Sequence, residues 1–152
     1  MTLLYLDSSA WLKRYFYEPG SGWMIRRFDS GDPLASSVLG YVEVTSALAR
    51  QQASRRLDEE KLGRLQQQLE EDWGDMAGLP LSDEVVSGAV RLARGYKLRG
   101  ADAVHLATAL SMNDALTGTR NSLVFIASDE ELLAAARQMG LAVENPAVAV
   151  YP

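Results

Sequence analysis

The chain has 152 residues, of which 47% are hydrophobic and 23% are charged, and its formal net charge is −5 at pH 7. This length and composition predict one domain, residues 1–152, with a substantial core. The absence of cysteine excludes disulfides, thiolate metal sites and cysteine nucleophiles, and the one histidine, His105, cannot form a histidine-rich metal site by itself. No apolar run approaches the roughly 18 residues of a membrane span, and the N-terminal MTLLYLDSS lacks the basic region of a signal peptide. We therefore expect a cytoplasmic protein without membrane association.

Short β-like runs alternate with helical patterns along the chain. Strands are predicted at 3–6, from 33 onward, at 123–127 and near 141–144. Helices are predicted at 8–18, at 21–28, at about 39–55, at 58–73, at 82–95, around residue 102 and at about 128–139. The run GLPL at 78–81 is interpreted as a connection between two of these helices. Strands interleaved with helices favour a layered α/β fold with a mainly parallel central sheet.

Four acidic residues lie where an apolar strand or helix would be expected to have none. They are Asp7 after the first strand, Glu43 inside the helix at 39–55, Asp102 in the apolar helix GADAVHLATALSM, and Asp129 after the strand at 123–127. A buried, unpaired carboxylate costs several kcal/mol or becomes neutral, so a shared cation would offset both desolvation and mutual repulsion. Ligands of parallel α/β sheets bind beyond the carboxyl ends of the strands, where Asp7 and Asp129 should meet. The four acids predict a divalent-metal site suited to metal-assisted hydrolysis.

Helix capping is the alternative explanation for three of these acids. Asp is a favoured N-cap residue, and three of the four lie near predicted helix starts. Ser8 and Ser128 are neighbouring cap candidates, and Ser128 with Glu131 would form a capping box that leaves Asp129 free. Glu43 lies inside its helix, where the alternative is a solvated residue on the outer face.

The order of these motifs resembles that of the PIN-domain family. The matching segments are, in order, LDSSAWLKRY followed by EPGS, then VEVTSALA, DAVHLATA and, after a late strand, SDEEL. Within this family the chain is most similar to the VapC-type toxin ribonucleases of toxin–antitoxin pairs, and the resemblance covers essentially the whole chain. One departure is Ala127, because the family often has a hydroxyl residue two positions before the last acid. Ser128 and Ser9 are possible substitutes for that hydroxyl.

The resemblance implies a three-layer PIN-like fold and a Mg²⁺- or Mn²⁺-dependent endoribonuclease that cleaves single-stranded or loop regions of RNA. Asp7 and Asp102 would be direct metal ligands, and Glu43 would complete the site or position a water. Asp129 would hold a water or help to bind a second metal ion. The resemblance also implies a cognate antitoxin protein as partner. The apolar faces of the helices at 8–18 and 58–73 are core by default, but they could receive that antitoxin or a second copy of the chain, and we expect a homodimer.

Other interpretations remain open on the sequence alone. A housekeeping PIN nuclease or a non-catalytic PIN regulatory module would have the same fold. A phosphatase that uses Asp7 as nucleophile is disfavoured, because Ser9 stands where such enzymes usually have a second Asp. His105 is more simply explained as a hydrogen-bonded structural histidine than as a catalytic group. Four basic residues near the acidic motifs could contact RNA phosphates or be solvated surface charges: Lys13, Arg14, Lys97 and Arg99.

Overall fold

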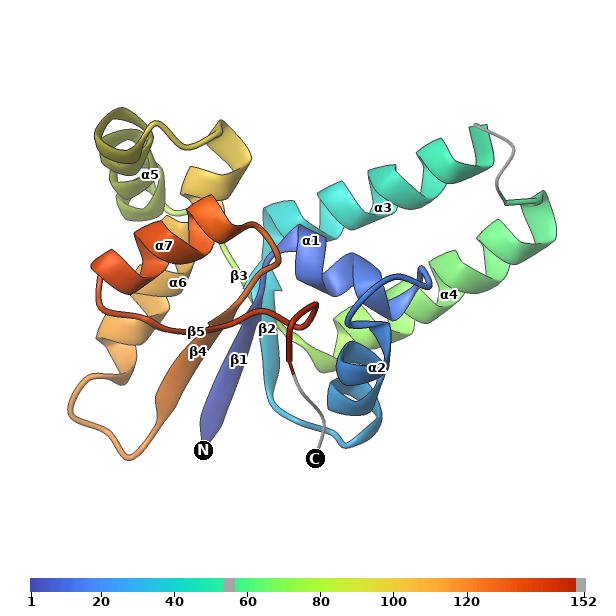
Figure 1. Ribbon diagram of the computed structural model, residues 1–152, viewed down its shortest axis with the longest axis horizontal. Coiled ribbons are helices and arrows are strands. Elements are labelled where there is room, and N and C mark those ends of the chain that lie inside the picture. Colours follow the sequence, from blue (N-terminus) through green and yellow to red (C-terminus); the bar gives the residue numbers. More distant parts are fainter. Residues whose placement is uncertain (54–56, 150–152) are drawn as a thin grey trace.

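The computed structural model describes residues 1–53 and 57–149, and the centre of this part is a five-stranded sheet (Figure 1). The strands are β1 (Thr2–Leu6), β2 (Leu34–Ser37), β3 (Ala77–Leu79), β4 (Ser122–Ile126) and β5 (Ala142–Glu144). They lie in the order β3-β2-β1-β4-β5, and every neighbouring pair is parallel. The predicted parallel α/β sheet is therefore confirmed, with all four predicted strands present.

The helices cover both faces of this sheet. They are α1 (Ser8–Trp11), the 3-10 helix η1 (Leu12–Arg14), α2 (Ser21–Asp29), α3 (Val38–Ala53), α4 (Glu59–Asp75), α5 (Asp83–Tyr96), α6 (Gly100–Leu116) and α7 (Glu130–Gln138). Figure 1 shows α5, α6 and α7 on one face and α1 to α4 on the other, so the three predicted layers are confirmed. The predicted end of the third helix near residue 55 lies outside the described residues. None of the described helices is long and apolar enough to cross a membrane.

Successive side chains of β1 point to opposite faces of the sheet, and the hydrophobic core is divided into two halves accordingly. Leu3 and Tyr5 pack among residues of α5, α6 and α7, whereas Leu4 and Leu6 pack among residues of α1 to α4. Successive side chains of a strand point to opposite faces, so a strand covered on both sides is apolar at nearly every position. The predicted core positions of the helix at 58–73 are confirmed, because Leu69 is buried and its apolar neighbours along the helix pack against the same half of the core.

The path of the chain reverses between β1 and β4. From β1 it proceeds outward to β2 and β3, and it then returns to the other side of β1 as β4 and β5. This reversal is a topological switch point, the place where ligands bind in sheets of this kind. Leu6 pairs with Ile126 at the ends of the two strands, and the Asp7 backbone N–H donates to the Ile126 carbonyl oxygen at 3.0 Å. The residues that follow β1 and β4 are thereby held side by side.

Two elements differ from the sequence-based expectation. The single helix expected at 8–18 is wrong, because α1 ends at Trp11 and the chain tightens into η1. Tertiary bonds override helical propensity here: the Tyr15 hydroxyl donates to Asp72 on α4 at 2.8 Å, and Arg14 binds the same carboxylate at 3.2 Å. Strand β3 was not expected, since it spans three residues with a glycine in the middle and forms through pairing with β2.

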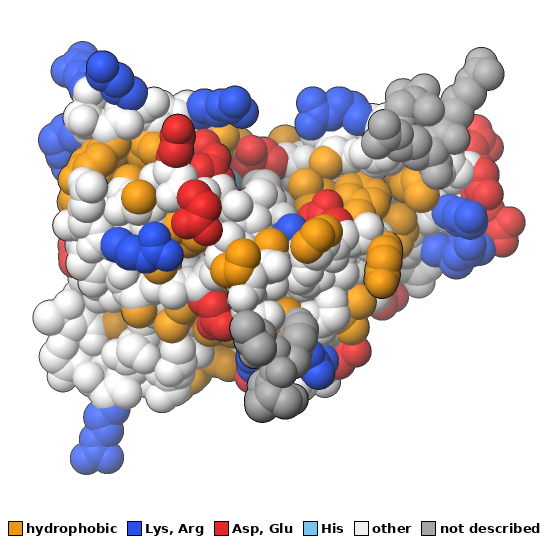
Figure 2. All heavy atoms as spheres, in the orientation of Figure 1, with side chains coloured by type: hydrophobic (Ala, Val, Ile, Leu, Met, Phe, Trp, Pro, Cys, Tyr) orange, Lys and Arg blue, Asp and Glu red, His pale blue; other side chains and the backbone are white. Residues whose placement is uncertain are grey.

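Helices α3 and α4 lie side by side and extend away from the sheet as a pair (Figure 1). The Trp73 ring on α4 stacks on Tyr41 of α3 at 5.0 Å between centroids and on Trp11 of α1 at 5.8 Å. Figure 2 shows hydrophobic side chains over α1, α3 and α4, and several acidic side chains between them and the α5 and α7 side. The aromatic stack therefore fixes the base of the helix pair against the helix that follows β1.

Candidate active site

The four acids predicted from the sequence all lie at the carboxyl edge of the sheet, near the switch point. Asp7 follows β1 directly, Glu43 lies in the helix that follows β2, Asp102 lies in the first turn of α6, and Asp129 follows β4. Burial is the main cause that raises the pKa of Asp102 and of Asp7; the charges of Asp129 and Glu43 add to it at Asp102, and the charge of Asp102 adds to it at Asp7. The structure thus places the four acids at one edge of the sheet, and their shared role in a metal site stays a prediction.

Asp7 is a buried carboxylate that also caps a helix. Only 3% of its surface is exposed, and its Oδ1 accepts hydrogen bonds from the Ala10 backbone N–H at 2.9 Å and from the Ser9 hydroxyl at 2.8 Å. Burial raises the pKa of Asp7 to about 6, although these two hydrogen bonds and the nearby His105 act to lower it. The Ser9 hydroxyl also lies 2.9 Å from Oδ2, so both carboxylate oxygens have a neighbouring donor, and the backbone cap itself uses Oδ1.

Glu43 is held from one side by two donors. Its Oε1 lies 2.6 Å from the Ser8 hydroxyl and 2.6 Å from Nε2 of His105. Partial burial raises the pKa of Glu43, but the hydrogen bonds from His105 and Ser8 outweigh it and hold the pKa below its ordinary value. The alternative that Glu43 is a solvated residue on the outer face of its helix is wrong, since it contacts α1 and α6.

His105 is buried and hydrogen-bonded at both ring nitrogens, which confirms its interpretation as a structural histidine. Nδ1 lies 2.9 Å from the Tyr5 hydroxyl, and Nε2 contacts Glu43 and, at 3.1 Å, Ser8. Tyr5 and Ser8 were missed as site-supporting residues from the sequence. No sequence signal identifies Tyr5, which reads as an ordinary strand residue, whereas Ser8 could have been found from its position directly after Asp7.

Asp102 and Asp129 differ in their surroundings. Asp102 is half-buried, and its pKa is raised by burial first and by the charge of Asp129 second. Asp129 is exposed and is the N-cap of α7, since its Oδ1 accepts from the backbone N–H groups of Glu131 at 2.9 Å and Leu132 at 3.2 Å. The capping box that would have left Asp129 free is therefore wrong. An ionised carboxylate accepts two backbone donors and interacts favourably with the helix dipole, so it displaces the neighbouring Ser128 from that role.

The hydroxyl missing at Ala127 is not replaced on Asp129. Ser9 donates to Asp7 instead, and its Oγ accepts from the Ser128 backbone N–H at 3.3 Å. Ser128 Oγ is buried and has no hydrogen-bond partner within the described residues. Ser9 thus links the segment after β1 to the segment after β4, across the switch point.

The acids have little cationic compensation from the protein. Within residues 1–53 and 57–149, no Lys or Arg forms an ion pair with Asp7, Asp102 or Asp129. In the same part of the chain, no three acidic or histidine side chains form a group that could hold a metal ion. The four acids therefore do not form a preformed group of three metal ligands within the described residues, and metal binding by them stays a prediction.

Two of the four basic residues near the acidic motifs are engaged elsewhere. Lys13 is buried and pairs with Glu18 at 3.2 Å, and Arg14 pairs with Asp29 at 2.9 Å and with Asp72. Their expected role as RNA contacts or solvated charges is wrong, because both side chains stabilise the packing around η1. Lys97 and Arg99 are exposed, as expected.

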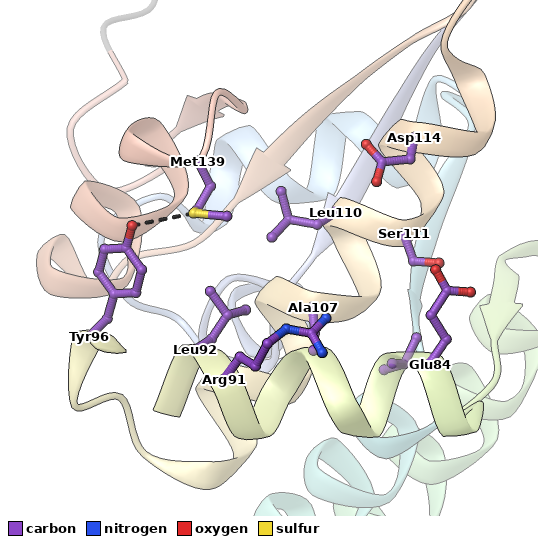
Figure 3. Close-up of a pocket in the computed structure, with 11 residues that line it drawn as sticks. Glu84, Arg91, Leu92, Tyr96, Ala107, Leu110, Ser111, Asp114 and Met139 are labelled. Atoms are coloured by element: carbon purple, nitrogen blue, oxygen red, sulfur yellow. Dashed lines mark hydrogen bonds between the residues drawn. The ribbon is translucent and has the colours of Figure 1, made fainter. Parts of the chain in front are cut away.

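A separate groove of about 450 Å³ lies between α5 and α6 (Figure 3). The Tyr96 hydroxyl lies 3.3 Å from the Met139 sulfur at one end, and the side chains of Glu84, Ser111 and Asp114 lie toward the other. None of the four site acids lines this groove. The acidic edge and the groove are therefore different features of the surface.

A parallel α/β sheet with acids from four segments at its switch point defines the class of this protein. The sequence matches the PIN domain family over residues 4–138, and the chain belongs to that family. It is 40% identical over 114 residues to Ribonuclease VapC45 of Mycobacterium tuberculosis, which covers 75% of this chain and 79% of that protein.

Two solved structures share the fold at low sequence identity. FitAcB from Neisseria gonorrhoeae has a TM-score of 0.71 at 19% identity and covers 96% of this chain and 99% of that one. VapBC-5 from Mycobacterium tuberculosis, a member of the VapBC family of toxin–antitoxin systems, has a TM-score of 0.59 at 18% identity and covers 94% and 96%. At these identities the likeness concerns the fold alone.

Proposed function

We propose that this chain is a divalent-metal-dependent endoribonuclease and the toxin of a type II toxin–antitoxin pair. The observation that carries the proposal is Asp7: a buried carboxylate whose pKa is raised to about 6, beside Asp102 and without an ion-pair partner. An arrangement that disfavours ionisation in the free protein favours a bound cation. The 40% identity to a ribonuclease points to RNA as the substrate.

The acids suit Mg²⁺ or Mn²⁺ better than a metal that needs a full protein cage. Hard cations prefer oxygen ligands, and Mg²⁺ commonly keeps several waters while it binds one or two carboxylates and substrate phosphate. Asp7 and Asp102 would be the direct ligands, Glu43 would complete the site or position a water, and Asp129 would hold a water or assist a second ion. The bound ion would lower the pKa of the attacking water and stabilise charge on the scissile phosphate.

The protein's own contribution is to fix the acids in place. The Ala10 N–H holds Asp7 through Oδ1 and Ser9 contacts both of its oxygens, while Ser8 and His105 hold Glu43 through Oε1. Because those hydrogen bonds lower its pKa, Glu43 stays ionised and can accept a hydrogen bond from water at neutral pH. No nucleophilic side chain is required for hydrolysis of this kind.

RNA would approach the acidic edge along its few free basic residues. Arg99 precedes α6 and is close enough to lower the pKa of Asp102, and Lys97 is exposed two residues earlier. Lys and Arg contacts to phosphate supply most sequence-independent affinity for nucleic acid. These two side chains would bind the phosphates that flank the scissile bond.

A cognate antitoxin and a second copy of the chain are the proposed protein partners, in a cytoplasmic setting. Support comes from the relative named as a VapC ribonuclease and from the fold shared with a VapBC toxin–antitoxin complex. The antitoxin would offer an apolar helix near α1 and α4 together with a basic side chain that enters the acidic edge and competes with the metal. Residues 1–152 would act as one PIN domain.

Cleavage assays on structured RNA with Mn²⁺ test the proposed site. Asp102→Asn and Glu43→Gln should each lose activity by about 100-fold or more, because each removes a charge that the transition state needs, while circular dichroism stays unchanged. Asp83→Asn is the matched control, since Asp83 also lies in the first turn of a helix but outside the site. Wild-type cleavage by a well-folded Asp102→Asn protein would remove Asp102 from the site.

Expression in the host tests the toxin assignment. The wild-type chain alone should slow growth, and co-expression of the proposed antitoxin, sought as the product of a small neighbouring gene, should restore it. Asp7→Asn should abolish toxicity without abolishing partner assembly. If the wild-type chain is abundant and harmless, and no product of a neighbouring gene co-purifies with it, the assignment as a toxin is wrong and a housekeeping PIN nuclease takes its place.

A further inference from the structure

Glu43 is connected to the sheet core by a chain of buried hydrogen bonds. Tyr5 of β1 is fully buried, and its ring stacks on Phe125 at 5.5 Å and meets the His105 ring edge-on at 5.9 Å. The Tyr5 hydroxyl lies 2.9 Å from Nδ1 of His105, and Nε2 of the same ring lies 2.6 Å from Glu43 Oε1. This series of hydrogen bonds links β1, through the His105 imidazole, to Oε1 of Glu43.

The direction of each hydrogen bond follows from the inventory of donors. The Ser37 backbone N–H donates to the Tyr5 hydroxyl oxygen at 3.2 Å. The Thr108 hydroxyl donates to the Val104 carbonyl oxygen at 2.7 Å, so its proton is not directed at Tyr5. Burial raises the pKa of Tyr5 far above its ordinary value, so the phenol keeps its proton. Nδ1 of His105 lies 2.9 Å from the hydroxyl and is an acceptor for that proton, and an accepting Nδ1 places the ring proton on Nε2. Nε2 can then donate to Glu43, which accepts only.

We propose that Tyr5 is a positioning residue for Glu43, because it selects the His105 tautomer that carries its proton on Nε2. With the opposite tautomer, an unprotonated Nε2 would face an ionised carboxylate at 2.6 Å, and Glu43 would have to turn away. Ser8 donates to the same Oε1, so both donors leave Oε2 for the acidic edge. The role in RNA cleavage rests on the proposed function, whereas the tautomer assignment does not.

Packing prevents the imidazole from moving to relieve a mismatch. Gly40 lies one turn before Glu43 on α3, and a Cβ added there would meet Ser36 Oγ at 2.5 Å and His105 Cε1 at 3.2 Å. The ring is therefore confined between α3 and Tyr5. Gly40→Ala removes no hydrogen-bonding group and would displace both the ring and the Ser36 hydroxyl, which donates to the Leu6 carbonyl at 2.7 Å.

The chain contains one histidine, so ¹⁵N-labelled imidazole signals report on His105 alone. In metal-free wild-type protein at pH 7.5 we expect a protonated Nε2 and an unprotonated Nδ1, because the Tyr5 hydroxyl lies 2.9 Å from Nδ1 and Glu43 Oε1 lies 2.6 Å from Nε2. Tyr5→Phe should move both signals toward the average of two tautomers. Tyr15→Phe is the matched control, because Tyr15 is also buried and hydrogen-bonded but contacts Trp11 and Asp72 instead. A wild-type ring protonated on Nδ1 or on both nitrogens, or an unchanged spectrum in Tyr5→Phe, would overturn the proposal.

Cleavage kinetics then test the consequence for Glu43. Loss of an outer partner of a metal-site ligand typically costs about 10- to 100-fold, so Tyr5→Phe should lower kcat by about 10-fold with little change in KM, and Tyr15→Phe should not. Equal kcat for Tyr5→Phe and wild type, despite an altered tautomer, would refute the positioning role. If wild type shows the expected tautomer but cleaves no RNA, the proposed function fails and the hydrogen-bond assignment stands.

Gly40→Ala decides the case in which Tyr5→Phe does not fold. The added methyl group should shift the Nε2 signal and lower kcat although the Tyr5 hydroxyl is retained. Unchanged kcat in this variant, with a displaced Nε2 signal, would overturn the proposal by itself.

Discussion

Replacing Asp7 with Asn should stabilise the metal-free protein at pH 8 and have little effect on stability near pH 4. The Asn side chain retains an oxygen that can accept from the Ala10 N–H and from Ser9, and Asn is as good an N-cap as Asp. The substitution therefore removes the buried charge while it keeps the cap. Its effect on the free energy of unfolding isolates the cost of that charge.

The magnitude follows from the pKa of Asp7, which burial raises from 3.8 to about 6. Because the folded state binds this proton more tightly than the unfolded state, the favourable contribution is fully present below pH 3.8 and is lost as pH rises through 6. A tenfold change in proton affinity is about 1.4 kcal/mol, so ionised Asp7 costs about 3 kcal/mol above pH 6. For a chain of this size that difference corresponds to about 6–12 °C in Tm.

Thermal and urea unfolding of both proteins with EDTA at pH 4, 6 and 8 would measure the effect. The stability difference should be small at pH 4 and grow toward pH 8. Mn²⁺ at about 1,000 times its Kd should then reverse the order, since it adds about 4.1 kcal/mol to the protein that binds it, which exceeds the cost of the buried charge. An Asn variant that is no more stable than wild type at pH 8 in EDTA would refute the argument that burial penalises this charge.

Two further predictions concern the elements around the site. Gly78→Ala should lower the free energy of unfolding by about 1–3 kcal/mol, because its Cβ would lie 2.7 Å from the stacked Trp73 ring. Gly63→Ala, on the open side of α4, should instead raise it by about 0.5–1 kcal/mol. Equal effects of the two variants in urea unfolding would contradict this. Asp129→Ala should remove the α7 N-cap and lower the free energy of unfolding by about 1 kcal/mol, whereas Asp129→Asn should keep the cap. Both variants should lower RNA cleavage. Full cleavage activity in Asp129→Asn would leave Asp129 with the capping role only.

The parts of the fold that could be predicted are those with a local signal. β1 and β4 are continuous apolar runs because both of their faces are covered, and the acids after them stand out against that background. The rule that ligands bind at a switch point then placed Asp7 and Asp129 together without any knowledge of the side-chain contacts. Glu43 and Asp102 were recognisable because each interrupts an apolar helix pattern.

The parts that could not be predicted depend on contacts between distant segments. β3 has weak strand propensity and exists because β2 offers it a partner, and α1 stops early because Arg14 and Tyr15 bind Asp72 on α4. The choice between Asp129 and Ser128 as the α7 cap depends on a competition that adjacent sequence positions do not resolve. The hydrogen bond between His105 and Glu43 joins α6 to α3, and neither sequence segment indicates that the two helices are in contact.

The pairing of β1 with β4 has a consequence for synthesis of the chain. These neighbouring strands are separated in sequence by β2, β3 and helices α1 to α6, and domains emerge from the ribosome N-terminus first. Until residue 122 has emerged, β1 presents an unpaired flank to solvent, and the segment that carries Asp129 does not yet exist. The acidic edge is therefore completed only late in translation, and a nascent chain has no complete cluster while most of it is being made.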